Sequence, residues 1–183
     1  VIIIETVGVG QSETAVAEMT DIFLLLLLPG GGDELQGIKR GIVELADVIV
    51  VNKADGDLES VAQRSARDYQ SALGFLHPRH QDWKVPVETC SALNHEGIDK
   101  IWNTICSYRK TMTDNGELKT TRARQAKEWM WNEISATLLE ALQRDESIKL
   151  QVATLEQQVA TGKTSPWIAA QKLVGIFSKT NTD

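Results

Sequence analysis

Short runs of apolar residues alternate with longer amphipathic segments through the first 112 residues of this chain. Four such runs stand at residues 1–4, 22–28, 48–51 and 85–87. A strand that is apolar on both of its faces is typical of a parallel sheet covered by helices on both sides. The pattern therefore predicts an α/β fold, with right-handed crossovers that bring the carboxyl ends of the strands to one edge.

The segments between these runs have the length and periodicity of helices. We expect helices at residues 11–20, 35–46 and 58–73, and a further helix that begins near Ile98. In the second of these segments the apolar residues stand three and four positions apart, which places them on one helix face. Asp57 is the expected N-cap of the third helix, because a carboxylate can accept the N–H groups at a helix start.

After about Met112 the strand pattern stops. Three helices are expected here, at residues 116–144, 148–160 and 166–177. Gly162 suits the end of the second helix, and Pro166 suits the start of the third. The chain is thus predicted to contain an α/β domain at residues 1–112 and an all-helical extension at residues 113–183.

The chain opens on an apolar run rather than on a methionine. Residues 1–4, Val-Ile-Ile-Ile, have the composition of the middle of a buried strand. Because a strand buried on both faces is normally flanked by covering elements, we expect this chain to be the C-terminal part of a longer protein.

The composition excludes several classes of protein. Nineteen Lys and Arg against 25 Asp and Glu leave a formal net charge of −6, which is unlike the basic surface of a general nucleic-acid binder. No apolar run reaches the roughly 18 residues of a membrane-spanning helix, so no membrane partner is expected. Cys90 and Cys106 are the only cysteines, which excludes a disulfide scaffold and favours a reducing, cytoplasmic location.

The clearest functional motif is Asn52-Lys53-Ala54-Asp55, directly after the run at residues 48–51. An ionised Asp accepts hydrogen bonds from both the N1–H and the 2-amino group of guanine, a pair of donors that adenine does not offer. The stem of Lys53 can lie along the base, and Asn52 can tie the loop to neighbouring backbone. The alternative is a polar turn. We favour guanine recognition, because ligands of open α/β sheets bind at the ends of the strands.

Two further segments follow strand-like runs. Ser91, Ala92 and Leu93 come after the fourth run, and a turn there can present backbone N–H groups to the carbonyl oxygen of guanine. After the first run, Glu5 can hold Mg²⁺ through water, and Gly8 can bring its N–H close to a γ-phosphate. Taken alone, this last segment is equally compatible with an ordinary glycine-rich loop. The guanine motif downstream favours the nucleotide interpretation.

The motifs and their order resemble the MeaB/ArgK family of GTPases. The stretches that carry the resemblance are residues 5–13 (ETVGVGQSE), 33–41 (DELQGIKRG), 45–47 (LAD) and 52–55 (NKAD). These are P-loop GTPases that act as accessory proteins of methylmalonyl-CoA mutase, and many carry the label of a lysine/arginine/ornithine (LAO/AO) transport system ATPase or kinase. The resemblance covers essentially the whole chain. It implies a mostly parallel, P-loop-GTPase-like sheet flanked by helices and followed by an all-helical extension.

The resemblance also implies cofactors, partners and residue roles. Residues 5–13 would form switch II, residues 29–41 would form a third switch that relays the nucleotide state to the mutase, and the helical end after about Thr113 would form a homodimer. The implied cofactors are GTP/GDP and Mg²⁺, and the implied partner is methylmalonyl-CoA mutase or a related cobalamin-dependent mutase in a bacterial cytoplasm. The residues concerned are Glu5 (also the Mg²⁺ side), Gly8 and Gln11 for catalysis, Asn52, Lys53, Asp55, Ser91, Ala92 and Leu93 for guanine, and Gly32, Asp33, Gln36 and Lys39 for the third switch.

Departures from the family pattern limit the expected activity. No G-x-x-x-x-G-K-[ST] phosphate-binding motif occurs in the 183 residues, so we expect this chain alone not to hydrolyse GTP. Ras-like proteins have a Gln directly after the switch II glycine, whereas here Val9 follows Gly8 and Gln11 stands two residues further on. Asp33 and Lys39 fit a helix cap and a solvated side chain as well as they fit a switch. Two other functions are weighed beside the GTPase: a non-catalytic dimerising interaction module, and a nucleotide-dependent kinase of a basic amino-acid transport system.

Other residues are assigned to structure rather than to chemistry. His77 and His80 have a spacing seen in metal sites, but Pro78 between them and the lack of a nearby ligand set favour a solvated loop. Cys90 is expected to be a small buried residue. Four tryptophans are expected in the core or at an interface: Trp102, Trp129, Trp131 and Trp167.

Overall fold

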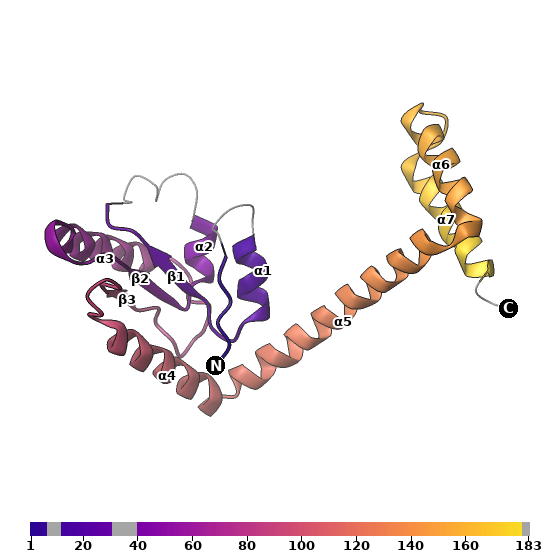
Figure 1. Cartoon of the computed structure of the whole chain (residues 1–183). Coiled ribbons are helices and arrows are strands. Elements are labelled where there is room, and N and C mark those ends of the chain that lie inside the picture. The colour runs from indigo at the N-terminus through magenta and orange to yellow at the C-terminus, as the bar shows by residue number, and fades with distance from the viewer. Residues whose placement is uncertain (7–11, 31–39, 181–183) are drawn as a thin grey trace. The chain divides into compact units, whose positions relative to one another are not determined.

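A computed structural model of the chain describes residues 1–6, 12–30 and 40–180. Its sheet has three parallel strands in the order β1-β2-β3, which are β1 (Leu24–Leu27), β2 (Val48–Val51) and β3 (Val87–Thr89). Leu24 of β1 pairs with Val48 of β2, and Ile49 of β2 pairs with Val87 of β3. The parallel α/β fold expected from the sequence is confirmed (Figure 1).

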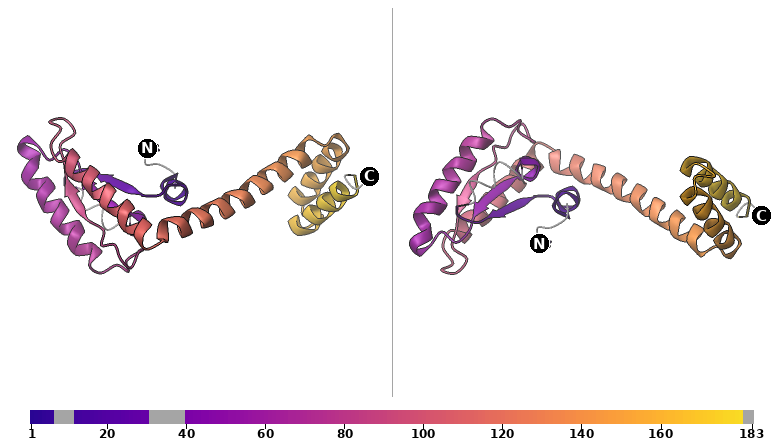
Figure 2. Two further views of the ribbon diagram at one scale, coloured as in Figure 1. Left: turned by 90° about the horizontal axis from the view of Figure 1, so that it is seen from below. Right: turned by 90° about the horizontal axis from the view of Figure 1, so that it is seen from above.

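Helices cover both faces of this sheet (Figure 2). On one face, Ile49 of β2 belongs to a core cluster that also contains Ala17, Val43 and Tyr69 from three different helices. On the other face, Val48 and Val50 pack against a helix through Ile101. The helices on the first face are α1 (Ser12–Met19), α2 (Arg40–Leu45) and α3 (Glu59–Leu73), and the helix on the second face is α4 (Ile98–Asp114).

The four residues of β2 explain the continuous apolar runs in the sequence. Successive side chains of a strand point to opposite faces of the sheet, and both faces of β2 are covered. All four residues are therefore fully buried, with 0% of their surface exposed. An apolar side chain is required at every position of such a strand, and not only at alternate positions.

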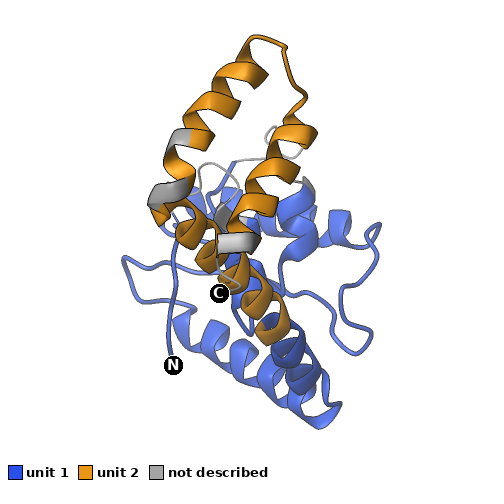
Figure 3. Ribbon diagram, turned by 90° about the vertical axis from the view of Figure 1, so that its right-hand side faces the viewer, with its two compact units in different colours: residues 1–125 blue, residues 126–183 orange. Residues whose placement is uncertain are grey.

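The chain divides into two compact units, residues 1–125 and residues 126–183 (Figure 3). Helix α5 (Glu117–Arg144) contributes to both units, and the second unit also contains α6 (Glu146–Ala160) and α7 (Pro166–Thr180). The domain boundary that we placed between residues 112 and 113 stays a prediction. In the part of the chain that the structure describes, no helix has both the length and the apolar character needed to cross a membrane.

The turn between α6 and α7 follows the expected chemistry. Gly162 has a φ of 70°, a left-handed conformation that favours glycine. Its N–H donates to the carbonyl of Val159 (3.0 Å), and the N–H of Lys163 donates to the carbonyl of Gln158 (2.8 Å). These two bonds form a Schellman motif that ends α6. The expected roles of Gly162 at this helix end and of Pro166 at the next helix start are confirmed.

The first apolar run is an exception to the sequence-based fold. Residues 1–4 form no strand, and the surfaces of Val1, Ile2 and Ile3 are 97%, 90% and 87% exposed. A strand is stabilised by ladder hydrogen bonds to a neighbour and by burial of its side chains. Among the described residues this run has no ladder partner. The expectation of a fourth, buried strand at residues 1–4 is therefore wrong in this structure.

The start of α3 also differs from the expectation. Its N-cap is Leu58, which makes no side-chain capping bond, and the expected cap Asp57 lies inside the 3-10 helix η2 (Gly56–Leu58). The N–H of Leu58 donates to the carbonyl of Asp55 (3.0 Å) and the N–H of Glu59 to that of Gly56. Because backbone carbonyls satisfy these N–H groups, a capping side chain is not needed, and the assignment of Asp57 as N-cap is wrong.

The four tryptophans that were expected in the core or at an interface all lie at the surface. Trp102, Trp129, Trp131 and Trp167 are between 49% and 72% exposed. The core assignment is therefore wrong within this chain, and the interface assignment stays a prediction.

Candidate functional site

The two loops expected to read guanine lie side by side at the carboxyl edge of the sheet. Asn52 follows β2 directly, and Ser91 comes two residues after the end of β3. Because β2 and β3 are parallel neighbours, their carboxyl ends lie at the same edge. Backbone hydrogen bonds join the two segments: the N–H of Cys90 donates to the carbonyl of Val51 (3.0 Å), and the N–H of Ala54 donates to the carbonyl of Cys90 (2.9 Å).

Asn52 ties these two loops together through one side-chain oxygen. Its Oδ1 accepts the backbone N–H of Lys53 at 2.7 Å and the backbone N–H of Ala92 at 3.1 Å, and the thiol Sγ of Cys90 lies 3.5 Å from the same atom. Two backbone donors from different loops thus converge on a single amide oxygen. Asn52 therefore has an architectural role at this edge, since it sets the spacing between the loop after β2 and the loop after β3.

Ser91 positions the carboxylate of Asp55. Its hydroxyl donates to Oδ2 of Asp55 at 2.5 Å, and the same hydroxyl accepts the N–H of Asn94 at 3.0 Å. Ser91 is fully buried, whereas Asp55 is half-buried at the edge of the sheet. The hydrogen bond limits rotation of the carboxylate, so that Asp55 is oriented before any ligand binds.

The backbone N–H groups of Ser91 and Ala92 were expected to face guanine, but both donate hydrogen bonds within the protein. The N–H of Ser91 donates to the carbonyl of Glu96 (3.0 Å), and the N–H of Ala92 donates to Asn52. To donate to a base, either amide has to share or exchange that bond. Leu93, the third residue expected to close over the base, is 79% exposed.

Lys53 has an unusual backbone conformation for its residue type. Its φ is 59°, in the left-handed region that costs a residue with a Cβ roughly 1 kcal/mol. The bond from its N–H to Asn52 and the neighbouring bond from Ala54 to Cys90 hold this conformation. Such conformations cluster at ligand sites. The Lys53 side chain is exposed.

Of the remaining nucleotide candidates, Glu5 is the one that the structure describes. Glu5 is described and exposed, in the segment at residues 1–6. The other candidates lie outside the described residues: Gly8, Gln11, Gly32, Asp33, Gln36 and Lys39.

Cys90 and His77 match their sequence-based assignments, whereas His80 does not. Cys90 is buried, which raises the pKa of its thiol, and His77 is exposed. His80 is not a solvated loop residue, because its side chain is only 12% exposed and lies between the carboxylates of Asp47 and Glu117. These two acids are 33 residues before it and 37 residues after it, so local spacing could not reveal them.

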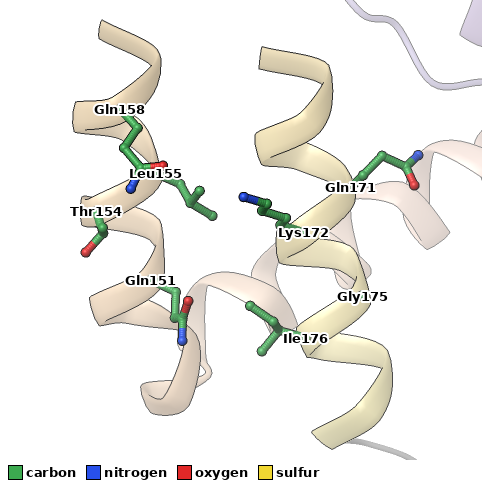
Figure 4. Close-up of a pocket in the computed structure, with 8 residues that line it drawn as sticks. All are labelled: Gln151, Thr154, Leu155, Gln158, Gln171, Lys172, Gly175 and Ile176. Atoms are coloured by element: carbon green, nitrogen blue, oxygen red, sulfur yellow. The ribbon is translucent and has the colours of Figure 1, made fainter. Parts of the chain in front are cut away.

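The second unit contains an open groove between α6 and α7 of about 390 Å³ (Figure 4). Five of its eight lining residues are polar, namely three glutamines, one lysine and one threonine, while Leu155 and Ile176 supply apolar surface. Only Lys172 carries a charge among the lining residues. The groove has no paired acid and base, and none of the residues expected from the sequence to form a site lies in it. The lining residues are Gln151, Thr154, Leu155, Gln158, Gln171, Lys172, Gly175 and Ile176.

A parallel sheet with these two polar loops at its carboxyl edge defines a P-loop-GTPase-like domain. The chain belongs to the family described as methylmalonyl Co-A mutase-associated GTPase MeaB, whose model matches residues 1–147. This finding confirms the resemblance seen in the sequence.

Three similar proteins illustrate the relationship. A protein of Caulobacter vibrioides is 50% identical over 177 residues, which cover 97% of this chain and 54% of that protein. The mouse protein named methylmalonic aciduria type A homolog, mitochondrial, is 48% identical over 177 residues, which cover 97% of this chain and 43% of the relative. A crystal structure of an LAO/AO transport system kinase matches 94% of this chain and 55% of its own, with a TM-score of 0.71 and 36% identity. The chain spans about half the length of the curated relatives it matches.

Proposed function

We propose that this chain forms the guanine-recognition part of a GTPase that serves methylmalonyl-CoA mutase or a related cobalamin-dependent mutase as an accessory protein. The observation that carries the proposal is the pairing of the Asn52–Asp55 loop with the Ser91 loop at the carboxyl edge of the sheet. Membership of the MeaB family and the name of the mouse relative support the choice of partner.

Base recognition follows from the orientation of Asp55. Its carboxylate can accept the N1–H and the 2-amino group of guanine together, and a bidentate pair of this kind is both strong and specific. The hydroxyl of Ser91 holds the carboxylate in place, and Lys53 can cover the face of the base with its aliphatic stem. Adenine has a bare N1 acceptor where guanine has a donor, so the ionised Asp55 repels it.

The phosphate side of the site is proposed from the family alone. Mg²⁺ would neutralise charge on the phosphates, and Glu5 is the residue of this chain proposed to hold it through water. Gly8 and Gln11 are proposed to act near the γ-phosphate, and residues 29–41 to report the nucleotide state to the mutase. The sequence of this chain contains no phosphate-binding motif. We therefore expect the chain alone to bind the base weakly and not to hydrolyse GTP.

Guanine specificity can be tested by converting Asp55 to asparagine. Ligand-observed NMR of the chain with millimolar nucleotide should detect GDP with a preference over ADP of about tenfold or more, the discrimination given by a bidentate contact. Asp55→Asn supplies an N–H donor in place of one carboxylate oxygen. The variant should lose GDP and gain xanthosine diphosphate, whose base carries a carbonyl where guanine carries the amino group.

The matched control for this experiment is Asp57→Asn, which changes a carboxylate two residues further on, in η2. It should retain the preference for GDP. Equal signals for GDP and ADP in the unmodified chain would contradict guanine recognition. The non-catalytic interaction module would then be the better description of this chain.

We further propose that α5 forms a homodimer with a second copy of the chain. The part of α5 in the second unit exposes a row of large apolar side chains, namely Trp129, Met130, Trp131, Ile134, Leu138 and Leu139. Exposed apolar patches of this kind mark protein interfaces. Spacings of three and four residues place Trp131, Ile134 and Leu138 on one face of the helix.

The dimer can be tested with a charge placed within that face. Trp131→Glu combined with Leu138→Glu should raise the dissociation constant measured by sedimentation about 100-fold or more, because buried aromatic residues dominate interface energy. The control is Asn132→Glu, which adds a charge at an exposed polar position of the same helix. A chain that is monomeric before any substitution would rule out the proposed interface.

A further inference from the structure

The buried carboxylate of Asp47 stands directly before β2 and joins several segments. Its Oδ2 accepts the backbone N–H of Phe23 at 2.8 Å, and its backbone carbonyl accepts the indole N–H of Trp83 at 2.8 Å. Arg79 lies 3.7 Å from the same Oδ2 and donates to the carbonyl of Leu45 at 2.9 Å. Asp47 is 2% exposed, so Phe23 and Arg79 rather than bulk water compensate the charge on Oδ2, while Oδ1 has no hydrogen-bond partner among the described residues.

His80 links Asp47 to the first turn of α5. Its Nε2 lies 3.2 Å from Oδ1 of Asp47, and its Nδ1 lies 2.5 Å from Oε2 of Glu117, the first residue of α5. The hydroxyl of Tyr108, from α4, lies 3.3 Å from Nε2, and the Tyr108 ring packs edge-to-face on the imidazole. One imidazole thus stands between two carboxylates that belong to different elements of the first unit.

The number of N–H donors that His80 offers to the two carboxylates depends on the protonation of its ring. A protonated imidazole has two N–H donors, one for each carboxylate, whereas a neutral imidazole has only one. When the ring is neutral, one of its nitrogens presents a lone pair to a carboxylate oxygen. The favourable ion pair at that nitrogen is then replaced by repulsion between two acceptors.

Burial decides which of the two contacts is lost. The side chain of Asp47 is 3% exposed, while that of Glu117 is 35% exposed. Among the described residues Oδ1 of Asp47 has no hydrogen-bond partner, so the ion-pair contact with Nε2 is what compensates its burial. An exposed carboxylate such as that of Glu117 recovers a lost hydrogen bond from water. The neutral ring therefore keeps its N–H on Nε2 toward Asp47 and releases Glu117.

We propose that His80 is a proton-operated latch, which holds the first turn of α5 on the α/β unit when the ring is protonated and releases Glu117 when the ring is neutral. Other contacts hold the next turns of the same helix. Arg122 forms a bidentate ion pair with Asp21, with Nε 2.7 Å from Oδ1, and Gln125 donates to the carbonyl of Thr20 at 2.9 Å. Neither contact changes protonation near neutral pH, so the release is confined to the start of α5.

The charged groups around His80 set the direction of its titration. The adjacent carboxylate of Asp47 raises the pKa of His80 most, and the bond to Glu117 raises it further, against the opposing effect of burial. Arg79 stays charged beside Asp47, and burial raises the pKa of the Tyr108 hydroxyl, which therefore stays neutral. A raised histidine pKa means that the latch stabilises the fold fully below about pH 6.5, the ordinary histidine value. This stabilisation is lost as the pH rises through the higher pKa of the folded state.

The latch can be tested by NMR titration of the imidazoles in the full chain. His80 should titrate at a higher pH than an ordinary histidine, and Glu117→Gln should lower its midpoint by about one pH unit, the effect of removing an adjacent opposite charge. Glu133→Gln is the matched control, because it removes an exposed glutamate from the same helix far along the sequence. The same His80 midpoint in both variants would overturn the proposal.

A second measurement separates a latch from a purely structural ion pair. As the pH passes the His80 midpoint, hydrogen-exchange protection of the amides at residues 120–121 should fall about tenfold relative to amides of α3, after correction for intrinsic exchange rates. Protection at residues 124–125 should not change, since the contacts of Arg122 and Gln125 do not titrate there. His80→Gln should abolish the pH dependence. A fall of the same size in this variant would show that His80 is not the latch.

Discussion

Alanine at Gly97 is expected to destabilise the α/β unit by about 3 kcal/mol or more. Gly97 has a φ of 77°, and a Cβ added there would lie 2.6 Å from the carbonyl oxygen of Thr89 and 3.3 Å from Cα and Cβ of Cys90. The left-handed conformation alone costs a residue with a Cβ roughly 1–2 kcal/mol. The clash adds to this cost, because its partner is the backbone of β3 rather than a flexible side chain that could move away.

Gly116→Ala is the control that separates the cost of the left-handed backbone conformation from the cost of the steric clash. Gly116 has a φ of 80°, but no atom lies within 4 Å of the position of its added Cβ. This variant should lose only about 1 kcal/mol. Urea unfolding, followed by the amide signals of β2, measures both losses in the same unit of the chain. Equal losses at the two glycines would mean that the close approach to Thr89 is not a real constraint.

The effect of Gly97 should extend to the candidate guanine site. Glu96, its neighbour, exchanges two backbone hydrogen bonds with Ser91, each 3.0 Å long, and Ser91 in turn orients Asp55. Displacement of Gly97 from β3 would move Glu96 and Ser91, and with them the Ser91 hydroxyl that holds the carboxylate of Asp55. Any GDP signal should therefore be lost in Gly97→Ala and retained in Gly116→Ala.

The parts of the fold that were predictable from the sequence are those in which local pattern and final packing agree. β2 was predictable because a strand covered on both faces must be apolar throughout. The turn at Gly162 and Pro166 was predictable because the backbone itself demands these residue types. The pairing of the loops at Asn52 and Ser91 followed from the parallel order of two neighbouring strands.

The parts that were not predictable depend on partners distant in the sequence. Residues 1–4 have the composition of a buried strand, but composition does not supply the neighbour that a strand requires. Asp57 has the chemistry of a helix cap, but η2 satisfies the N–H groups first. His80 was assigned to solvent because neither Asp47 nor Glu117 is near it in the sequence. Such contacts become visible only when the fold brings the segments together.

Asp47→Ala is expected to be the second strongly destabilising substitution, with a loss of about 3–5 kcal/mol, the usual cost of removing one partner from a buried ion pair. The substitution leaves the N–H of Phe23 without its acceptor at the start of β1, and it leaves His80 and Arg79 without their shared carboxylate. Alanine also creates a cavity, since Asp47 is among the largest fully buried side chains.

Asp47→Asn separates the charge of this side chain from its size. The amide oxygen can still accept the N–H of Phe23, so the loss of stability should be smaller than with alanine. The charge is absent, however, and the adjacent carboxylate of Asp47 is the main cause of the raised pKa of His80. The His80 midpoint should therefore fall toward the ordinary histidine value in this variant, even where the fold persists.

Asp114→Ala is the matched control for both substitutions at Asp47. It removes a carboxylate that pairs with Lys110 on an exposed turn of α4, where water replaces the lost contact. Urea unfolding should find this variant close to the unmodified chain. If Asp47→Ala were no less stable than Asp114→Ala, Asp47 would not be the acid that joins β1, β2 and the His80 loop. The proton-operated latch would then be ruled out. It requires that Asp47 is the buried carboxylate, which water cannot solvate, so that the neutral ring releases Glu117 instead.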